Sequence, residues 1–205
     1  MKISFRIGIG RTHMPSYFEI RWHGRGGQGT VTGAKTLAEA VQGTGKYVTA
    51  FPEYGPERRG APVRAFNRFA DHKVRTHTPV QVPDLVIVVD PTLIGNPQLI
   101  EGVQDRVTFI VNTEKSAEET GKALGLAGNR LFTVPANRIS RELFGKEIPN
   151  SAVLGAFARA YPEIISLERL VAETRHAFVS LLGKTLAEKN IEAVQRGFKE
   201  GDLSA

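Results

Sequence analysis

Three short runs of mostly apolar residues limit the fold of this chain more than any other feature. They are Leu85 to Val89, Val107 to Val111 and Leu131 to Val134, and an Asp, Asn or Pro follows each of them. A strand that is apolar along its whole length is buried on both faces, as in a parallel sheet with helices on each side. The intervening stretches predict helices at Pro97 to Gln104, Ser116 to Leu124 and Asn137 to Phe144. The expected fold class is therefore α/β, a three-layer α/β/α arrangement around a mostly parallel, Rossmann-like sheet.

An earlier strand leads directly into a glycine-rich loop. Tyr17 to His23 alternates around apolar side chains, and apolar residues from Val31 to Val41 recur at helical spacing. Between these segments, Gly24, Gly26 and Gly29 match the pattern G-x-G-x-x-G. Glycine leaves room for a phosphate to approach the backbone N–H groups and the positive end of the helix. The loop therefore predicts an anionic ligand near the start of this helix.

Two other interpretations of the glycine pattern stay open. A dinucleotide-binding enzyme requires an acidic residue about 20 positions further on, at the end of the second strand, to bind the ribose. Glu53 lies 24 residues after Gly29, but Pro52 precedes it and an irregular loop follows where a dinucleotide fold has a helix. Alternatively, the glycines serve only a tight turn and close packing of the helix on the sheet.

Further strands are expected on the side of the sheet that is not purely parallel. Tyr47 to Phe51 has the composition of a short strand, and so do Val63 to Phe69 and Val74 to Thr78. Asp71 and His72 are suited to the turn of a hairpin between the last two segments. The sheet is therefore expected to carry an antiparallel edge hairpin.

The last third of the chain is expected to be helical. Ser151 to Ala160 is one helix, and an apolar stripe from Leu167 to Leu181 follows a Ser166 suited to an N-cap. We expect this part to pack on the sheet. No linker or internal repeat interrupts residues 17–205, which are predicted to form one domain. Residues 1–16 are predicted to be an extension, either disordered or the product of a misassigned start, since Met14 is an alternative first residue.

A second loop, from Glu53 to Gly60, concentrates charge among Pro and Gly residues. Its candidate contact residues are Glu53, Tyr54, Glu57, Arg58, Arg59 and Gly60. Adjacent arginines on a rigid loop suit bidentate contacts to a phosphate or carboxylate. The alternatives are a solvated turn or a contact with a partner chain.

Composition excludes several classes of function. The chain has no cysteine, so it can form neither a disulfide nor a cysteine-ligated iron–sulfur cluster. Its net charge of +6 is spread along the chain without a basic run, which argues against nucleic acid as a partner. No apolar stretch has the length of a membrane span or a secretory signal, so a cytoplasmic protein is expected. The histidines lack the spacing of metal ligands, and we predict neither a catalytic residue nor a metal ligand in this chain.

Five segments resemble the gamma subunits, or fused gamma domains (domain III), of pyruvate and related 2-oxoacid:ferredoxin oxidoreductases. They are Glu19 to Lys35 (EIRWHGRGGQGTVTGAK), Ala50 to Phe66 (AFPEYGPERRGAPVRAF), Pro83 to Leu93 (PDLVIVVDPTL), Ile148 to Phe157 (IPNSAVLGAF) and Lys184 to Phe198 (KTLAEKNIEAVQRGF). They follow one another in the family's order. Such a series is far more specific than a lone glycine pattern.

The resemblance implies a role in a multi-subunit enzyme of the pyruvate synthase type. In that family, a 2-oxoacid, most often pyruvate, is reversibly decarboxylated to acyl-CoA, and electrons pass to ferredoxin. Thiamine diphosphate, Mg²⁺ and iron–sulfur clusters are held by partner subunits, of the alpha, beta and delta types, which also select the 2-oxoacid. The resemblance assigns the gamma subunit to coenzyme A and to assembly. A free-standing NAD(P)-binding enzyme and a purely structural docking subunit are the alternatives.

The same resemblance singles out residues for coenzyme A. In the family, a loop and helix similar to GRGGQGTVTGAK meet this substrate, and they correspond here to Gly24, Arg25, Gly26, Gly27, Gln28, Gly29, Thr30 and Lys35. The resemblance also implies that the loop from Glu53 to Gly60 faces the subunits that carry the active site. Lys35 is expected about two turns into the helix, where its side chain can extend back toward the loop.

Overall fold

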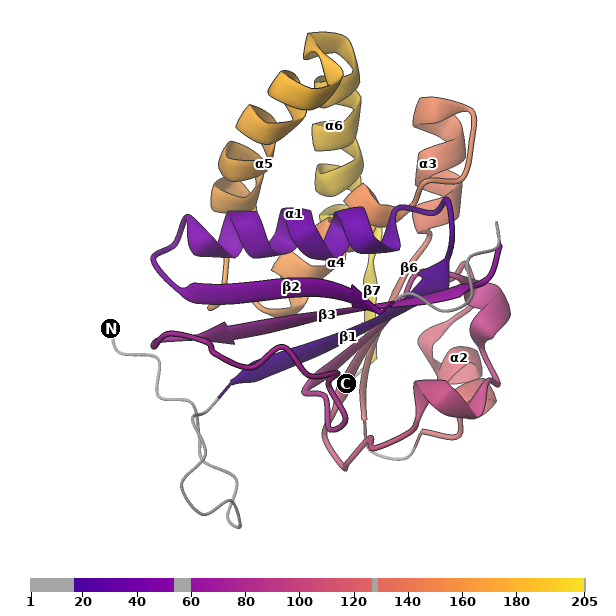
Figure 1. Ribbon diagram of the computed structural model, residues 1–205. Helices are drawn as coiled ribbons and strands as arrows, with labels where there is room; N and C mark the ends of the chain where they lie inside the picture. Colours follow the sequence, from indigo (N-terminus) through magenta and orange to yellow (C-terminus); the bar gives the residue numbers. More distant parts are fainter. Residues whose placement is uncertain (1–16, 54–59, 127–128, 205) are drawn as a thin grey trace.

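The computed structural model of the chain describes residues 17–53, 60–126 and 129–204. Over these ranges, one sheet contains seven strands in the order β2-β3-β1-β4-β5-β6-β7 (Figure 1). The strands are β1 (Phe18–Arg25), β2 (Tyr47–Glu53), β3 (Pro62–Ala70), β4 (Leu85–Val88), β5 (Thr108–Asn112), β6 (Arg130–Val134) and β7 (Asp202–Ser204).

Most strands of the sheet run in the same direction. Neighbours β1, β4, β5 and β6 pair in parallel, whereas β3 is antiparallel to both β1 and β2, and β7 is antiparallel to β6. Since β3 is reversed relative to both of its neighbours, β2 runs in the same direction as β1. The predicted mostly parallel sheet is confirmed, with β3 and β7 as its reversed strands.

Helices cover both faces of the sheet, as the apolar runs predict. They are α1 (Thr30–Gln42), α2 (Ala117–Leu124), α3 (Ala136–Phe144), α4 (Asn150–Ala160), α5 (Leu167–Leu182) and α6 (Lys184–Glu200), with 3-10 turns at Pro91–Leu93 and Pro97–Leu99. Figure 1 shows α1, α5 and α6 on one side of the sheet and α2 on the other. No helix among the described residues is long and apolar enough to cross a membrane.

Strand β4 shows how the two cores are divided. Leu85 and Ile87 belong to the cluster shared with α1 and α4, whereas Val86 and Val88 belong to the cluster shared with α2. Successive side chains of a strand point to opposite faces, so a strand between two helical layers is apolar at every position. The three-layer arrangement therefore follows directly from the apolar runs.

The expected antiparallel edge of the sheet is confirmed by β2 and β3, but the expected pairing of Val63–Phe69 with Val74–Thr78 is wrong. Strand β3 pairs with β2 on one side and β1 on the other, which leaves no free edge for residues 74–78. These residues are irregular, with Val74 buried. Proline at positions 79 and 83 removes backbone donors from the following segment, which disfavours a ladder there.

Two further expectations are corrected. The helix predicted at Pro97 to Gln104 is only a 3-10 turn over Pro97–Leu99, capped by Asn96. Gly102 follows it with φ of 67°, and a Cβ there would lie 2.0 Å from the Gln81 carbonyl oxygen, so the chain turns away from a helix. Strand β7, three residues long after α6, was not predicted.

The predicted packing of the C-terminal helices on the sheet is confirmed for α4, which contacts β5 and β6, whereas α5 packs on α1 and α6, and α6 packs on α3 and α4. Helix α4 is buried at all but one of its positions, and Val194 of α6 belongs to the same core. A Cβ at Gly155 of α4 would lie 1.9 Å from the Val194 carbonyl oxygen, and one at Gly197 of α6 would lie 1.9 Å from the Ala152 carbonyl oxygen. Glycine at both positions therefore lets the two helix backbones touch.

Candidate functional site

The glycine loop opens onto a pocket of about 800 Å³. Parallel α/β sheets bind ligands at the carboxyl ends of strands, where neighbouring strands send the chain to opposite faces. Strand β1 leads to α1 on one face, and its neighbour β4 leads to the 3-10 turns on the other. The described residues that line the pocket come from the loop, α1, β3 and the C-terminal helices: Arg25, Gly26, Gly27, Gly29, Thr30, Val31, Thr32, Val63, Phe144, Lys146, Ile148, Asn150, Phe178, Leu182, Leu186, Lys189 and Asn190.

The glycines of the loop are required by its backbone. Gly27 and Gly29 have φ of 97° and 77°, in the left-handed region that side chains disfavour. A Cβ at Gly24 would lie 2.1 Å from Thr30 Oγ1, so the first residue of α1 packs directly over the end of β1. The loop is thus a tight turn whose backbone is accessible from the pocket.

The N-termini of α1 and α4 meet at this pocket. A Cβ at Gly29, the N-cap of α1, would lie 2.8 Å from Cγ of Asn150, the first residue of α4. Among the described residues, no side chain caps either helix, and neither first turn contains an acidic residue. The leading N–H groups of a helix have no partner within it and carry partial positive charge. Two such ends therefore point their donors toward one site.

Two polar side chains at these helix ends make no hydrogen bond to another described residue, and the hydroxyl oxygen of one of them, Thr30, is fully buried. Thr30 is 2% exposed, and its Oγ1 has no hydrogen bond within the described part of the chain. Asn150 is 7% exposed, lines the pocket, and makes no side-chain hydrogen bond to another described residue. A buried polar group without a partner costs about 1–3 kcal/mol, so such groups usually serve a ligand or water.

The charges at the pocket are of one sign. Arg25, Lys146 and Lys189 line it, and no Asp or Glu does so among the described residues. The charge of Arg25 is partly neutralised by a residue that does not line the pocket, because its Nε lies 3.1 Å from Oδ2 of the buried Asp90. The Gln28 amide also donates to Asp90 at 2.8 Å. This carboxylate holds the loop in place without facing the pocket.

One side of the pocket is an apolar wall. Phe178 and Leu182 come from the end of α5, and Leu186 comes from the start of α6. Phe144, the last residue of α3, adds to this wall. Phe178 also packs with Ala187 and Ile191 in a small cluster between α5 and α6. An ion pair between Arg175 and Glu188 joins the same two helices. The wall is therefore held by contacts within this helical pair.

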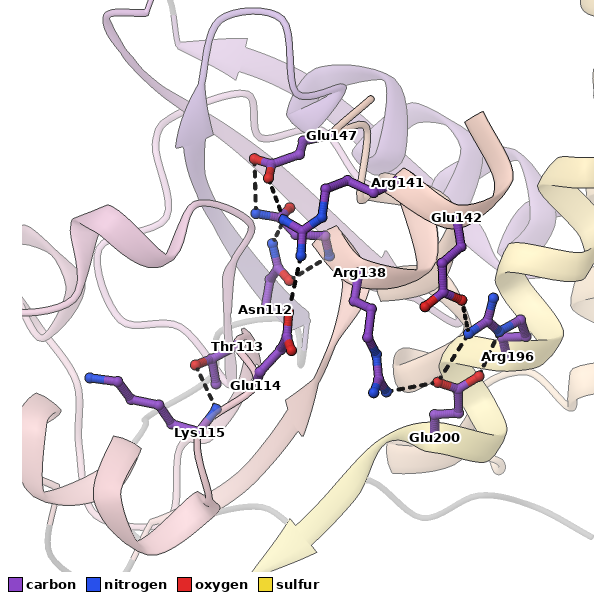
Figure 2. A network of polar contacts seen from close by, with 11 residues as sticks. Asn112, Thr113, Glu114, Lys115, Arg138, Arg141, Glu142, Glu147, Arg196 and Glu200 are labelled. Carbon is purple, nitrogen blue, oxygen red and sulfur yellow. Dashed lines mark hydrogen bonds and ion pairs between the residues drawn. The ribbon is translucent and has the colours of Figure 1, made fainter. Parts of the chain in front are cut away.

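A polar network fixes the segment between α3 and α4 that carries Lys146 and Ile148. Arg141 Nη1 lies 2.6 Å from Glu147 Oε1, and Figure 2 shows Arg141 between Glu147 and Glu114. Ser140 Oγ donates to the Lys146 carbonyl oxygen at 2.7 Å and accepts from the Ile148 N–H at 2.6 Å. These contacts place the pocket lining on a fixed backbone.

The same network extends to α6, beside a smaller depression of about 380 Å³. Arg196 pairs with Glu142 and Glu200, and Arg138 also pairs with Glu200 (Figure 2). Opposite charges therefore neutralise one another and join α3 to α6. We interpret this depression as part of a structural brace.

The residues predicted for coenzyme A do not all face the pocket. Those that line it are Arg25, Gly26, Gly27, Gly29 and Thr30, whereas Gly24 packs under Thr30 and Gln28 contacts Asp90. Lys35 is exposed, does not line the pocket, and makes no ion pair with a described residue. It lies one turn beyond Thr32 on the exposed face of α1, from which a lysine side chain can extend toward the pocket.

The two predicted loops are in contact at their described ends. Arg25 Nη1 donates to the Gly60 carbonyl oxygen at 3.0 Å, and the Gly26 N–H donates to the Ala61 carbonyl oxygen at 3.2 Å. At the other end of the second loop, Glu53 pairs with Arg64 at 2.7 Å. Tyr54, Glu57, Arg58 and Arg59 lie outside the described residues, as does the N-terminal extension 1–16.

His23 and Trp22, which precede the loop, are part of the core. Trp22 is fully buried and donates from Nε1 to Asn67 Oδ1 at 2.7 Å. Burial, followed by the charges of Arg21 and Arg64, lowers the pKa of His23 to about 3. The neutral ring accepts a hydrogen bond from Arg21 Nε at 3.0 Å.

Sequence reasoning missed most of the pocket contributed by the C-terminal helices. Lys146, Phe178, Leu182, Leu186 and Lys189 are far from the glycine loop in the chain, and no local motif joins them to it. One signal was present: Leu182 and Leu186 flank Gly183, where the apolar stripe is broken and the helices turn. Within the described residues, no group of His, Asp or Glu is suited to a metal ion.

Comparisons with known proteins agree on one family. The family model for pyruvate ferredoxin/flavodoxin oxidoreductase matches residues 19–200. The gamma subunit common to the pyruvate and ketoisovalerate oxidoreductases of Thermococcus kodakarensis is 44% identical over 182 residues, which are 89% of this chain and 96% of that protein.

A solved structure of a relative gives the same result. The crystal structure of pyruvate oxidoreductase subunit PORC from Thermotoga maritima matches with a TM-score of 0.80 and 39% identity, over 92% of this chain and 99% of that one. A 2-oxoglutarate:ferredoxin oxidoreductase from Magnetococcus marinus, with 2-oxoglutarate, coenzyme A and succinyl-CoA bound, matches with a TM-score of 0.70 at 19% identity. That match covers 90% of this chain but 31% of the longer one, and it supports the shared fold alone.

Proposed function

Because the chain belongs to the pyruvate ferredoxin/flavodoxin oxidoreductase family, we propose that it is the gamma subunit of a 2-oxoacid:ferredoxin oxidoreductase and contributes the coenzyme A contact. The enzyme reversibly converts a 2-oxoacid and coenzyme A to acyl-CoA and carbon dioxide, and ferredoxin takes the electrons. Pyruvate is the proposed substrate, since relatives are pyruvate synthase subunits. This chain binds coenzyme A and contributes to assembly of the complex, and none of its own groups reacts.

One observation carries the proposal: a pocket that combines anion-binding helix ends with an apolar wall. Coenzyme A bears several phosphates and a long uncharged pantetheine arm. The N-termini of α1 and α4, together with Lys146 and Lys189, suit the phosphates. At about 800 Å³, the pocket lies within the range of sites for small molecules and cofactors.

The residues of this chain act in the reaction by holding the substrate. Backbone N–H groups of the glycine loop donate to phosphate oxygens, and the amide of Asn150, which lines the pocket, gains a partner. Lys35 adds a charge from the outer face of α1. Thiamine diphosphate on a partner subunit supplies the decarboxylation chemistry. A coenzyme A thiol that is already oriented loses less conformational freedom when it reacts. A binding subunit contributes to the reaction in this way.

The family also implies partner chains. We propose alpha, beta and delta-type subunits that carry thiamine diphosphate, Mg²⁺ and iron–sulfur clusters, ferredoxin as the acceptor served by the complex, and a cytoplasmic location. The loop from Glu53 to Gly60 is proposed to face these subunits, because its end at Gly60 contacts Arg25 beside the pocket. Residues 17–205 are proposed as one domain.

The geometry disfavours the alternative of a free-standing NAD(P) enzyme. In that fold, the strand that carries the ribose-binding acid lies next to the first strand. Here β3 separates β2 from β1, and Glu53 at the end of β2 is paired with Arg64. The acid is therefore neither adjacent to the glycine loop nor free.

Steady-state kinetics of the assembled oxidoreductase test the proposal. Lys35→Ala and Lys146→Ala each remove one positive charge near the phosphates, so the coenzyme A KM should rise about two- to fivefold while the 2-oxoacid KM is unchanged. Lys122→Ala removes an exposed lysine from α2, on the other face of the sheet, and serves as the control.

The outcomes separate binding from docking. An unchanged coenzyme A KM in both variants would contradict the coenzyme A role. If the variants instead lose assembly with their partners, while the assembled fraction has normal kinetics, the chain is a purely structural docking subunit.

A further inference from the structure

We infer that the turn between α5 and α6 is the surface by which this chain contacts the partner subunit that holds thiamine diphosphate. The contact is made by an apolar tip, which consists of Val179, Leu181, Leu182 and Leu186. The inference rests on the proposed function and adds where the chain joins the complex. Val179 and Leu181 do not line the coenzyme A pocket, so the tip extends beyond the ligand contacts.

Exposed apolar side chains gather at this turn. Among the described residues, six large apolar side chains are strongly exposed, and four of them fall within residues 179–186. The other two are Tyr47, at the start of β2, and Ile100, after the second 3-10 turn. Leu181 is the most exposed of the six, at 78%. Single exposed apolar residues are ordinary on protein surfaces, whereas a group of them marks an interaction site.

The tip is held on a small core of its own. Phe178, Ala187 and Ile191 are buried together between α5 and α6, in a cluster separate from the main core. The ion pair between Arg175 and Glu188 joins the same helices. Figure 1 shows the turn at the end of this helical pair that lies farthest from the sheet. The apolar side chains therefore lie on a preformed projection, which needs little ordering when it binds.

The residues around the tip have the composition of an interface. Ser180, Lys184 and Thr185 are exposed between and beside the apolar side chains. Interfaces between proteins have an apolar centre with few charges and a polar rim. Residues 178–183 include no charged side chain, so covering them leaves no charge buried without a partner.

The position of the tip identifies its partner. Leu182 and Leu186 line the pocket and are also 42% and 39% exposed, so they stand at its opening. The coenzyme A thiol has to reach thiamine diphosphate, which a partner subunit is proposed to hold. That subunit must therefore lie over the opening, where it meets the tip. Leu181 and Val179 continue the same surface outside the pocket.

A second copy of this chain fits the tip less well. Two tips packed around a two-fold axis would bring the openings of two pockets together. Each copy would then occupy the space through which the cofactor of the partner subunit must approach. The surface that covers the tip is therefore an apolar area of the subunit that holds thiamine diphosphate.

The chain offers matched variants for a test. Leu181→Gln and Val179→Gln each place a polar amide in the tip at a position that does not line the pocket. Ile100→Gln makes a similar change at a side chain that is 45% exposed, and its neighbour Leu99 packs in the core on the α2 face of the sheet. Circular dichroism of each variant chain checks that the helices are retained.

Dissociation of this chain from the purified oxidoreductase, followed by mass photometry on dilution, measures the contact. The apolar surface exposed at Leu181 predicts that Leu181→Gln raises the dissociation constant about ten- to hundredfold. The smaller exposed surface of Val179 predicts a rise of about three- to tenfold for Val179→Gln. Ile100→Gln should leave the constant unchanged. Unchanged constants in both tip variants, or an equal rise in Ile100→Gln, would overturn the inference.

Photocrosslinking identifies what covers the tip. The assembled oxidoreductase with p-benzoylphenylalanine in place of Leu181 should give a crosslink to the subunit that binds thiamine diphosphate. A crosslink to any other chain, including a second copy of this one, contradicts the inference, and so does the absence of a crosslink between chains.

Failure of this inference is distinguishable from failure of the proposed function. If the tip variants leave assembly unchanged while Lys146→Ala raises the coenzyme A KM, the coenzyme A role stands and the docking surface is wrong. If the tip variants weaken assembly while Lys35→Ala and Lys146→Ala leave that KM unchanged, the docking surface stands and the coenzyme A role is wrong.

Discussion

Alanine at Gly29 should destabilise the chain more than alanine at Gly27, two residues earlier. Both glycines have positive φ, so alanine at either position takes on backbone strain of about 1–2 kcal/mol. The surroundings differ: nothing lies within 4 Å of a Cβ at Gly27, whereas one at Gly29 would lie 2.8 Å from the side chain of Asn150. The comparison therefore isolates the contact between the two helix ends.

The size of the difference in stability between the two variants follows from the crowding at Gly29. Forcing an extra methyl into a packed site costs about 1–3 kcal/mol. The free energy of unfolding should therefore fall by about 1–2 kcal/mol for Gly27→Ala and by about 2–5 kcal/mol for Gly29→Ala. Removing the Asn150 amide in a Gly29→Ala/Asn150→Ala double variant should recover most of the difference, because the two sites are directly coupled.

Urea unfolding followed by tryptophan fluorescence measures these values. The chain has a single tryptophan, Trp22, which is fully buried in β1 just before the loop. Equal losses of stability for Gly27→Ala and Gly29→Ala, or additive effects in the double variant, would refute the direct contact between the ends of α1 and α4.

Two other predictions concern the core. His23 stays neutral in the folded chain because its pKa is about 3, whereas the unfolded chain protonates this residue below about pH 6.5, so stability falls as the pH drops through that value. Between pH 8 and pH 5, the free energy of unfolding measured with urea should fall by about 2 kcal/mol. This fall should be absent in His23→Gln and retained in a variant of the exposed His72. An equal fall in His23→Gln would contradict the prediction. Gly155→Ala, whose Cβ would lie 1.9 Å from a backbone oxygen of α6, should cost about 3 kcal/mol, whereas Gly121→Ala in α2 meets only an ordinary contact at 3.7 Å and should stabilise the chain by up to about 1 kcal/mol. Losses of similar size in both would show that α4 and α6 do not touch as described.

The parts of the fold that the sequence predicted are those with a local or repetitive signal. Strands β4, β5 and β6 were recognisable because a strand between two helical layers is apolar at every position. The turn from β1 to α1 was recognisable because its backbone requires glycine at Gly27 and Gly29. The Ser116 cap of α2 was also visible in the sequence.

The parts that were missed depend on contacts between distant segments. Residues 74–78 have the composition of a strand, but both edges of β3, with which they would pair, are occupied by β1 and β2. The helix expected from Pro97 is cut short by the close approach of Gly102 to Gln81. Asp90 ends a strand, and the sequence did not indicate that it binds Arg25 and Gln28 of the glycine loop.

The candidate site divides in the same way. Its anion-binding half contains a sequence motif, because the backbone of a tight turn demands particular residues. Its apolar half has none, because Phe178 and Leu186 are ordinary core-type residues until α5 and α6 place them opposite the loop. Folding, rather than a local pattern, brings the two halves together.

Hydrogen exchange of the assembled oxidoreductase, with and without coenzyme A, tests the central claim most directly. The free N–H groups at the starts of α1 and α4 are the donors assigned to the phosphates. Saturating coenzyme A should slow exchange of the backbone amides of Gly27, of residues 29–32 and of residues 150–152, and leave α2 unchanged. If neither segment is protected while the enzyme turns over coenzyme A normally, this chain does not bind the substrate.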